Sequence, residues 1–250
     1  MERSEYMRLA EHENSYWWFV VKRRLVRYCV QRYGPPTLDV AYLLDIGCGT
    51  GANLAQLRQF SPHSIGLDYS PEALKYARSR HGVQLGQGDI LHIPLAGNSL
   101  DLVTCLDVLY HRWISSDEAA LAECYRILKP GGMLILTDSA FSCLSGPHDA
   151  VNLAARRYSV PQMREKLVRL GFKIKKQSYV HAWLFPIALI RRWFQQTMSP
   201  RSSPRSDVQA LPGWLNTLLL LIGSLEITWL KAGNLPLGTS VLFVAQKPGG

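Results

Sequence analysis

Residues 43–51 read Leu43-Leu44-Asp45-Ile46-Gly47-Cys48-Gly49-Thr50-Gly51, an apolar run that enters a glycine-rich turn. Glycine lets the backbone turn tightly and approach a ligand that a Cβ atom would push away. A second short apolar run follows at residues 64–67 and ends in Asp68. An acid at the end of the second strand can accept hydrogen bonds from ribose hydroxyls. The stretch therefore predicts a strand, a turn and a helix that together hold a nucleoside.

The chemistry of the loop narrows the ligand. The glycine spacing is Gly-x-Gly-x-Gly, whereas a dinucleotide pyrophosphate loop carries Gly-x-Gly-x-x-Gly. Asp45 also stands two residues before the first glycine. A carboxylate beside the loop disfavours a pyrophosphate and favours a cationic group such as an amino-acid ammonium. S-adenosylmethionine, which carries an adenosine, an ammonium and a sulfonium, meets both conditions.

Length and composition bound the class of protein. The chain has 250 residues, of which 47% are hydrophobic, enough for one domain with insertions. The N-terminal residues are charged and lead into no apolar signal segment. Five cysteines are scattered and none has Cys-x-x-Cys spacing, which predicts free thiols in a reducing cytosol and no zinc site. They are Cys29, Cys48, Cys105, Cys124 and Cys143.

The charge is strongly positive, with a formal net value of +9. Basic residues cluster at 22–24, 173–176, 191–192 and 201–205. Such clusters fit a nucleic acid, a membrane surface or an anionic substrate, and they equally fit solvated faces of the protein.

Apolar runs and helical patterns alternate along most of the chain. Strands are expected at 42–46, 64–68, 83–87, 100–106, 133–137, 172–180 and 239–246. Helices are expected at 15–33, 52–60, 71–81, 115–128 and 159–170, the last two opening at Ser115-x-x-Glu118 and Ser159-x-x-Gln162 capping boxes. This alternation predicts an α/β fold with a parallel sheet, which binds ligands at the carboxyl ends of its strands.

Residues 182–238 break this alternation. Apolar stretches at 182–190 and 213–230 flank a segment rich in Ser, Pro and Arg. The second stretch approaches the length of a membrane span, but Asn216 and Glu226 lie within it, and a buried charge is costly in a bilayer. We expect a buried helix of a substrate cap; a helix on a membrane surface and a true span are the alternatives.

Five motifs, in order, resemble the class I S-adenosylmethionine-dependent methyltransferases, in particular the type 11 small-molecule methyltransferases. The resemblance covers about residues 40–180 and the final strand. The motifs are Leu44–Gly51, Gly66-Leu67-Asp68-Tyr69-Ser70, Gly88-Asp89-Ile90, Leu106-Asp107-Val108-Leu109-Tyr110-His111 and Arg126-Ile127-Leu128-Lys129-Pro130-Gly131-Gly132.

The resemblance implies a Rossmann-like, seven-stranded, mostly parallel sheet with an antiparallel last strand and helices on both faces. Residues 37–181 and 238–250 would form the cofactor-binding core, and residues 1–36 a helical lid. Residues 182–237 would be an apolar cap inserted between strands six and seven, over the mouth of the active site.

The resemblance also assigns the cofactor site. The loop residues Gly47, Cys48, Gly49 and Gly51 would wrap the methionine end of S-adenosylmethionine, with Asp45 beside them. Asp68 would hold the ribose, Tyr69 would pack on the adenine, and Asp89 would bind the adenine amino group beside Ile90. Leu106 and Asp107 would line the sulfonium side.

The residues on the side of the methyl acceptor can be assigned from their positions in the chain. A hydroxyl acceptor needs a general base, whereas an amine or a stabilised carbanion does not. His111 follows strand four at the catalytic edge and is the first candidate base, and His148 is the second. Each can equally be structural. Expected substrate contacts are Trp18, Tyr110, Arg156 and Tyr158, and no metal is expected.

These expectations favour methyl transfer to a small, lipophilic or natural-product acceptor by a cytoplasmic enzyme. Peripheral membrane contact through residues 182–230 stays open, as do the acceptor atom and the oligomeric state. A NAD-dependent oxidoreductase lacks support in the glycine spacing. A nucleic-acid methyltransferase of the amino-group type would carry an Asn/Asp-Pro-Pro-aromatic motif where residues 106–110 read Leu-Asp-Val-Leu-Tyr. A non-catalytic adaptor with a cofactor-binding fold is the remaining alternative.

Overall fold

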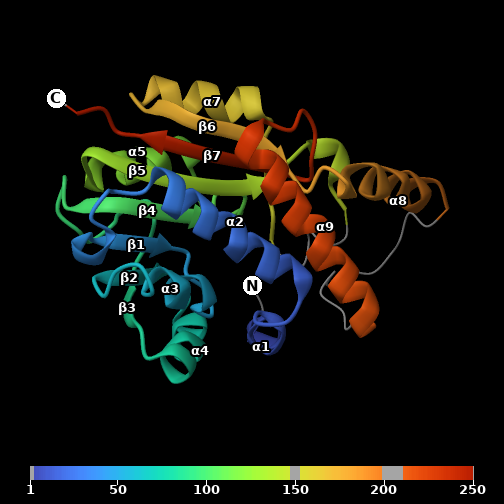
Figure 1. The fold of residues 1–250 in the computed structure, drawn as a ribbon, viewed down its shortest axis with the longest axis horizontal. Coiled ribbons are helices and arrows are strands. Elements are labelled where there is room, and N and C mark those ends of the chain that lie inside the picture. The colour runs from blue at the N-terminus through green and yellow to red at the C-terminus, as the bar shows by residue number, and fades with distance from the viewer. Residues whose placement is uncertain (1–2, 147–152, 199–210, 250) are drawn as a thin grey trace.

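The computed structural model describes residues 3–146, 153–198 and 211–249. Its centre is one seven-stranded sheet with the order β3-β2-β1-β4-β5-β7-β6 (Figure 1). Strand β7 is antiparallel to β5 and β6, and the other paired strands are parallel. This confirms the predicted sheet and its antiparallel last strand. The strands are β1 Leu43–Ile46, β2 Ser64–Asp68, β3 Gln84–Gln87, β4 Leu100–Leu106, β5 Leu128–Ser139, β6 Lys173–Val180 and β7 Ser240–Gln246.

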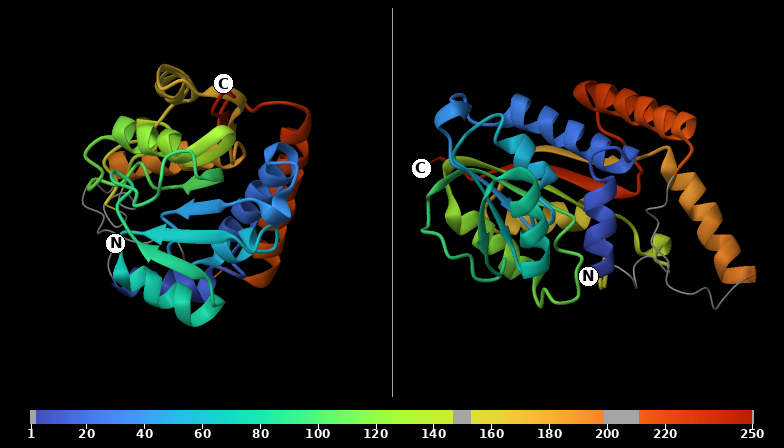
Figure 2. Two further views of the ribbon diagram at one scale, coloured as in Figure 1. Left: turned by 90° about the vertical axis from the view of Figure 1, so that its left-hand side faces the viewer. Right: turned by 90° about the horizontal axis from the view of Figure 1, so that it is seen from below.

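Helices cover both faces of the sheet (Figure 2). Helices α5 (Asp117–Ile127) and α7 (Val160–Arg169) pack on one face and share one hydrophobic core with it. Helix α2 (Trp17–Tyr33) and part of α9 (Gly213–Ala232) pack on the other face around a second core. Because both faces are covered, all four residues of β1 are buried, as expected of a central parallel strand.

Local signals place most helix ends. Ser159 and Gln162 form the predicted capping box of α7, and Ser70 caps α4 (Pro71–His81). The predicted box at Ser115 is wrong, because Ser116 is the residue whose side chain accepts from the backbone of the first turn of α5. Helix α3 spans Ala52–Leu57.

The N-terminal region differs from the single helix predicted over 15–33. A separate helix, α1 (Arg3–His12), precedes α2 and lies beside α4. Two short 3-10 turns, η1 (Leu38–Val40) and η2 (Ser142–Leu144), complete the described core.

The insertion between β6 and β7 forms helices α8 (Leu184–Met198) and α9. Helix α9 runs alongside α2, and α8 projects away from the sheet (Figure 1). By length and composition α9 is long and apolar enough to cross a membrane, with a mean hydropathy of 1.3 and 17% of that stretch buried. The prediction of a buried helix is therefore wrong, because only Gly223, Ile227 and Leu230 of α9 are buried.

Candidate active site

A cavity of about 340 Å³ lies at the carboxyl ends of β1, β2 and β4. Its floor is the glycine-rich loop after β1, and helices α1 and α2 contribute the opposite wall. Within the described parts of α8 and α9, no residue lines this cavity. The N-terminal helices thus form one wall of the cavity, and helix α9 of the insertion packs on the outside of α2.

The glycine loop has a backbone that other residues rarely adopt. Gly47, Gly49 and Gly51 have φ angles of 67°, 55° and 91°. A Cβ atom on Gly47 would lie 2.4 Å from Cγ2 of Val108, which follows β4. The Gly47 amide donates to the carbonyl of Leu67 at 2.7 Å. The loop is therefore fixed between β2 and the segment after β4, with no room for a side chain at its first position.

Asp68 ends β2 with both carboxylate oxygens engaged by backbone. Its Oδ2 accepts from the Gly49 amide and its Oδ1 from the Ser70 amide, each at 2.8 Å. Burial raises the pKa of this carboxyl, and the two amide hydrogen bonds oppose that effect. A carboxylate oxygen can accept more than one hydrogen bond, so Asp68 retains acceptor capacity for ligand hydroxyls.

Asp45 is a buried carboxylate with one oxygen still to be satisfied. Its Oδ1 accepts from the Thr104 hydroxyl at 2.5 Å and from the Asn53 side-chain amide at 2.9 Å. Its Oδ2 is buried and has no hydrogen-bond partner among the described residues. Burial raises the pKa of Asp45 to about 6. An unpartnered carboxylate oxygen on a cavity wall fits an ammonium ligand, because such a group would supply the missing donor.

The adenine side of the predicted site is also assembled. Tyr69, Asp89 and Ile90 all line the cavity. Asp89 Oδ1 accepts from the Leu91 amide at 2.9 Å, which orients the carboxylate, and Ile90 is buried. The Tyr69 ring is 62% exposed at the edge of the cavity, where a flat ring can cover a bound base.

Asp107 carries the contact that the sequence did not reveal. It has a φ of 56° directly after β4, and its carboxylate forms an ion pair with Lys22 of α2 and accepts from the Thr137 hydroxyl. The Lys22 ammonium also lies 5.1 Å from the centre of the Trp18 ring. This pair ties helix α2 to the carboxyl end of β4.

Aromatic rings form the remaining wall. Tyr110, His111 and Trp113 follow β4 and line the cavity, as does Trp18 from α2. His111 is buried and stacks on Trp113 with ring centroids 3.9 Å apart. Trp18 packs on the buried His181 at 4.2 Å, and burial lowers the pKa of His181 to about 3, so this ring is neutral.

Some predicted site residues lie elsewhere. Arg156 donates to the carbonyls of Leu109 and Ile114, and the Tyr158 hydroxyl also donates to Leu109. Neither residue lines the cavity, and both support the segment behind it, so their substrate roles stay predictions. Gly51 is the N-cap of α3 just outside the lining, and His148 lies outside the described residues.

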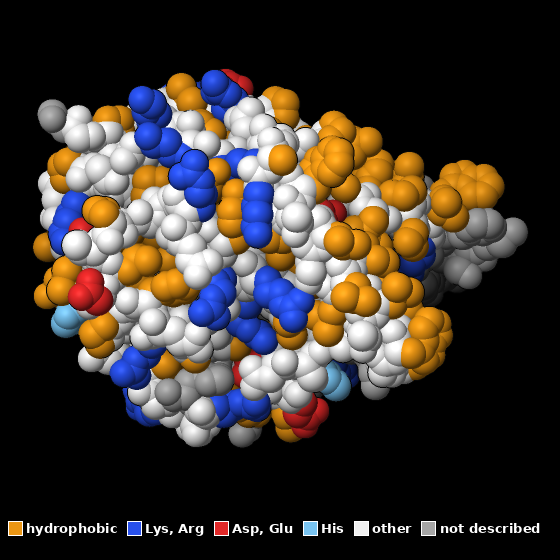
Figure 3. All heavy atoms as spheres, in the orientation of Figure 1, with side chains coloured by type: hydrophobic (Ala, Val, Ile, Leu, Met, Phe, Trp, Pro, Cys, Tyr) orange, Lys and Arg blue, Asp and Glu red, His pale blue; other side chains and the backbone are white. Residues whose placement is uncertain are grey.

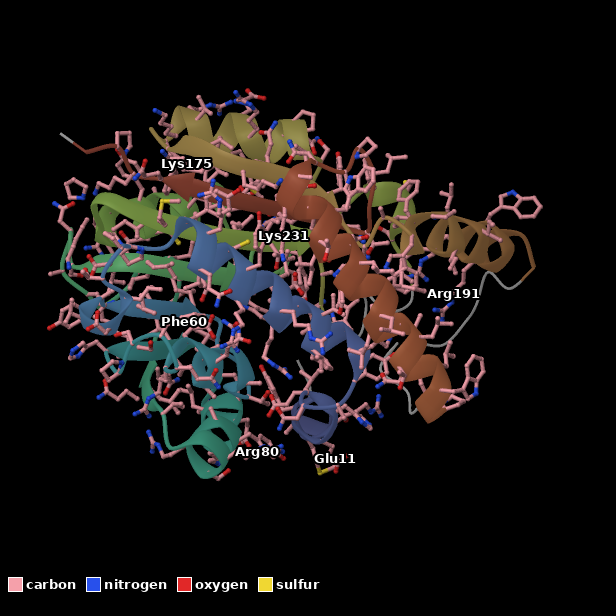
Figure 4. The ribbon with its side chains drawn as sticks, in the orientation of Figure 1. Glu11, Phe60, Arg80, Lys175, Arg191 and Lys231 are labelled. Carbon is pink, nitrogen blue, oxygen red and sulfur yellow. The ribbon has the colours of Figure 1, made fainter. Side chains whose placement is uncertain are left out.

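Helix α1 and its following turn supply residues that sequence reasoning missed. Tyr6, Leu9 and Glu13 line the cavity. Glu13 is buried, accepts from the Thr50 hydroxyl in the glycine loop, and lies 3.5 Å from the Arg80 side chain of α4. Figure 4 shows Arg80 beside α1. The signal for these residues is weak, since no motif marks them and only the fold brings them to the loop.

The fold is Rossmann-like, and the groups that line its cavity suit a nucleoside bearing a cationic group. Among the described residues, no group of three His, Cys, Asp or Glu side chains could hold a metal ion. All five cysteines are free, as predicted.

Comparison with known proteins finds methyltransferases among the relatives of this chain. Residues 44–136 match a family model described as a methyltransferase domain. The chain is 30% identical over 170 residues to a "Probable S-adenosylmethionine-dependent methyltransferase" of Mycolicibacterium smegmatis, over 65% of this chain and 62% of the relative. It is 34% identical over 147 residues to a malonyl-[acyl-carrier protein] O-methyltransferase of Pectobacterium atrosepticum, over 51% of this chain and 57% of the relative. It is 36% identical over 110 residues to a demethylmenaquinone methyltransferase of Lactiplantibacillus plantarum, over 40% and 46% of the two chains.

Solved structures show the same fold. A methyltransferase solved with the Haloferax volcanii Trm112 activator has a TM-score of 0.63 at 19% identity and covers 99% of this chain and 96% of its own. A phosphoethanolamine N-methyltransferase 2 of Haemonchus contortus, in complex with S-adenosyl-L-methionine, has a TM-score of 0.60 at 21% identity, over 90% and 52% of the two chains. Residues 44–136 therefore match a methyltransferase domain, and the chain has the fold of solved S-adenosylmethionine-dependent methyltransferases. It spans about half to three fifths of the length of the curated relatives described above.

Proposed function

We propose that this chain transfers a methyl group from S-adenosylmethionine to a small, lipophilic acceptor. One observation carries the proposal: three different groups face one cavity. Asp45 presents a buried oxygen without a partner among the described residues, the glycines of the loop present bare backbone, and Asp68 presents an oriented carboxylate. Three chemically different parts of the cofactor thus each have a matching group.

The chain's own residues would act first by holding the cofactor. When bound, S-adenosylmethionine supplies a methyl group already activated by a sulfonium. Asp45 would hold the ammonium, Asp68 the ribose hydroxyls, and Asp89 the adenine edge beside Ile90. Since the donor is activated, the protein mainly orients the acceptor, and orientation contributes roughly 7–11 kcal/mol in favourable cases.

The acceptor side is largely apolar. Trp18, Tyr110 and Trp113 exclude water, and aromatic faces attract a neighbouring cation by about 0.5–2 kcal/mol. His111 is the candidate base that would accept the proton of a hydroxyl acceptor. Its place among these rings supports a lipophilic acceptor, and the similarity to a demethylmenaquinone methyltransferase agrees with that class.

The lid supplies the polar contact on this side. The Lys22 ammonium forms an ion pair with the Asp107 carboxylate at the carboxyl end of β4, and both residues line the cavity. An acidic group on the acceptor would compete with Asp107 for the Lys22 ammonium. We therefore expect acceptors that combine an apolar body with a hydroxyl or carboxyl group.

Calorimetry and a turnover screen test this function. The purified protein should bind S-adenosylmethionine and its demethylated product with affinities in the micromolar range or better. It should then release S-adenosylhomocysteine when supplied with lipophilic phenols, quinols or carboxylic acids. Binding without turnover across the screen would favour the non-catalytic adaptor, and the absence of binding would refute the proposal. We place the enzyme in the cytoplasm, with a small molecule as its substrate.

A further inference from the structure

Helix α9 is largely apolar, but only one of its sides is covered. Gly223, Ile227 and Leu230 are buried on the side that faces the protein. The opposite stripe recurs every three or four residues and consists of large exposed side chains. Their exposed fractions are 71% for Trp214, 45% for Leu218, 59% for Leu221, 69% for Leu225 and 64% for Trp229.

Helix α8 adds to this surface. Ile187, Ile190 and Trp193 follow one another at intervals of three residues, with exposed fractions of 56%, 57% and 61%. Figure 3 shows hydrophobic side chains gathered over the side of the molecule that α9 and α8 form. We call these eight side chains the apolar face: Ile187, Ile190, Trp193, Trp214, Leu218, Leu221, Leu225 and Trp229. A patch of this kind marks an interaction surface.

Polar contacts hold α9 to the protein body. Asn216 accepts from the Trp17 amide and donates to the Ser15 carbonyl, each at 2.9 Å. Arg24 donates to the Ser224 hydroxyl at 2.6 Å, and Lys176 donates to the Leu230 carbonyl at 2.7 Å. A helix that crossed a bilayer would lose these contacts, so α9 stays on the surface of the fold.

The acid within α9 also points inward. Glu226 accepts from the backbone amides of His181 and Ala182, at the end of β6. Burial raises the pKa of Glu226, and these two hydrogen bonds oppose the shift. The exposed stripe of α9 therefore carries no carboxylate. Its large side chains are leucine and tryptophan.

Basic side chains border the apolar face. Arg24 is exposed on α2 and donates to Ser224 of α9, and Lys231 is exposed at the end of α9. Lys175 on β6 lies on the same side of the molecule as Lys231 (Figure 4). Figure 3 shows Lys and Arg side chains spread over this side next to the hydrophobic ones. The protein as a whole carries a net charge of +9.

We propose that the apolar face docks on an anionic lipid bilayer, with α9 lying parallel to the membrane plane. Amphipathic surfaces with Trp and Leu on one part and Lys or Arg beside it bind at the headgroup boundary of anionic membranes. Trp214 and Trp229 stand near the two ends of α9, and Trp favours that boundary over the hydrocarbon interior. A protein partner or a second copy of the chain fits less well, because the exposed stripe offers few polar groups to fix a register.

Docking would bring the cavity close to lipid. The Asn216 contacts fix the start of α9 against the turn before α2, and Trp18 and Phe19 of α2 line the cavity. A lipophilic acceptor dissolved in the membrane would then have a short path to the site. This last step rests on the proposed function, whereas the docking itself does not.

Vesicle flotation of the full chain tests the docking. The probe is vesicles of phosphatidylcholine with 30% phosphatidylglycerol, and vesicles of phosphatidylcholine alone are the comparison. The wild type should float with the anionic vesicles, and Leu221→Glu with Leu225→Glu should lower the partition coefficient at least tenfold. The matched control is Val40→Glu with Val168→Glu, which adds the same charge at side chains that are 60% and 47% exposed on η1 and α7. It should float like the wild type.

A second pair of variants tests the charge. Lys175→Ala with Lys231→Ala should weaken binding roughly fivefold per lysine at low salt. Lys75→Ala with Arg78→Ala removes two exposed charges on α4 and should have little effect. Affinity for S-adenosylmethionine, measured on each variant, should stay within twofold of the wild type and shows that the fold is intact.

Three results would overturn the proposal. The first is a wild type that does not float with the anionic vesicles. The second is flotation that is unchanged by Leu221→Glu with Leu225→Glu. The third is a stable dimer that the same double variant dissociates, while the protein does not bind vesicles. Flotation by a protein that binds no S-adenosylmethionine would uphold the docking and refute the proposed function, so the two can fail separately.

Discussion

Replacing Asp45 by Asn isolates the buried carboxylate of the cofactor site. In the wild type Asp45 keeps hydrogen bonds from Thr104 and Asn53 on one oxygen, while the other oxygen has no partner among the described residues. Asn can keep both hydrogen bonds on its carbonyl oxygen and turn its amide toward the position of the second oxygen. The substitution therefore removes the charge and leaves the surrounding contacts in place.

The magnitude follows from the pKa shift. Burial raises the pKa of Asp45 from 3.8 to about 6 in the folded protein. Folding thus favours the protonated carboxyl of Asp45. The stability that this protonation contributes to the folded state is complete below about pH 4 and is lost as the pH rises through about 6. A shift of about two units corresponds to about 3 kcal/mol between these limits, at 1.36 kcal/mol per unit.

The Asn variant does not titrate at this position. Its free energy of unfolding, relative to the wild type, should therefore be higher at pH 8 than at pH 5 by roughly 1–2 kcal/mol. Comparing the two proteins at each pH cancels the other titrating groups. It also cancels the fixed cost of the unpaired Asn amide, about 1–3 kcal/mol.

Cofactor binding should change in the opposite direction. If Asp45 holds the ammonium, losing this charge-assisted contact costs roughly 1.5–3 kcal/mol, or about 10- to 150-fold in affinity. Binding to the ionised carboxylate also makes the wild-type affinity about tenfold weaker at pH 5 than at pH 8, and the Asn variant should lack that dependence. Urea denaturation and calorimetry at both pH values measure these quantities. An unchanged affinity with a parallel pH profile would refute the role of Asp45.

Three further predictions concern the loop, the candidate base and the support behind the site. Gly47→Ala should destabilise the fold by about 1–3 kcal/mol and abolish cofactor binding, because its φ is 67° and its Cβ would lie 2.4 Å from Val108; Val108→Ala in the same chain should recover part of the loss in urea denaturation. His111→Ala should lower kcat for a hydroxyl acceptor by about 10²–10⁴-fold while leaving cofactor affinity within twofold; unchanged turnover at saturating cofactor would show that His111 is not a base. Arg156→Ala should reduce the free energy of unfolding by about 1–3 kcal/mol, since its guanidinium donates to the Leu109 and Ile114 carbonyls. A loss of acidic-acceptor binding without any loss of stability would instead support its predicted substrate role.

The sequence by itself determined the sheet and which loops after its strands line the cavity. Strand β4 spans the predicted residues 100–106, and Ser159 and Gln162 cap α7 as predicted. These features are local, because alternation, capping and glycine turns depend on residues a few positions apart. The place of Asp68 could be predicted for the same reason, since an acid at the end of β2 has to lie at the carboxyl edge of a parallel sheet.

Local reasoning cannot choose between two neighbouring residues that suit the same position equally well. Ser115 and Ser116 both suit an N-cap, and the path of the chain into α5 selects Ser116. Likewise, the apolar pattern of α9 is the same for a buried, a spanning or a surface helix. The contacts of Asn216 and Glu226 with distant backbone fix it on the outside of α2.

The tertiary structure alone decided which distant groups meet at the site. Lys22 and Asp107 are 85 positions apart, and Thr50 and Glu13 are 37 apart, yet both pairs join the N-terminal helices to the cavity. The sequence predicted that Arg156 binds the substrate. In the structure its guanidinium donates to backbone carbonyls 42 and 47 positions away. Partner choice for a charged side chain depends on which acceptors the packed helices bring near it, and no local pattern records that arrangement.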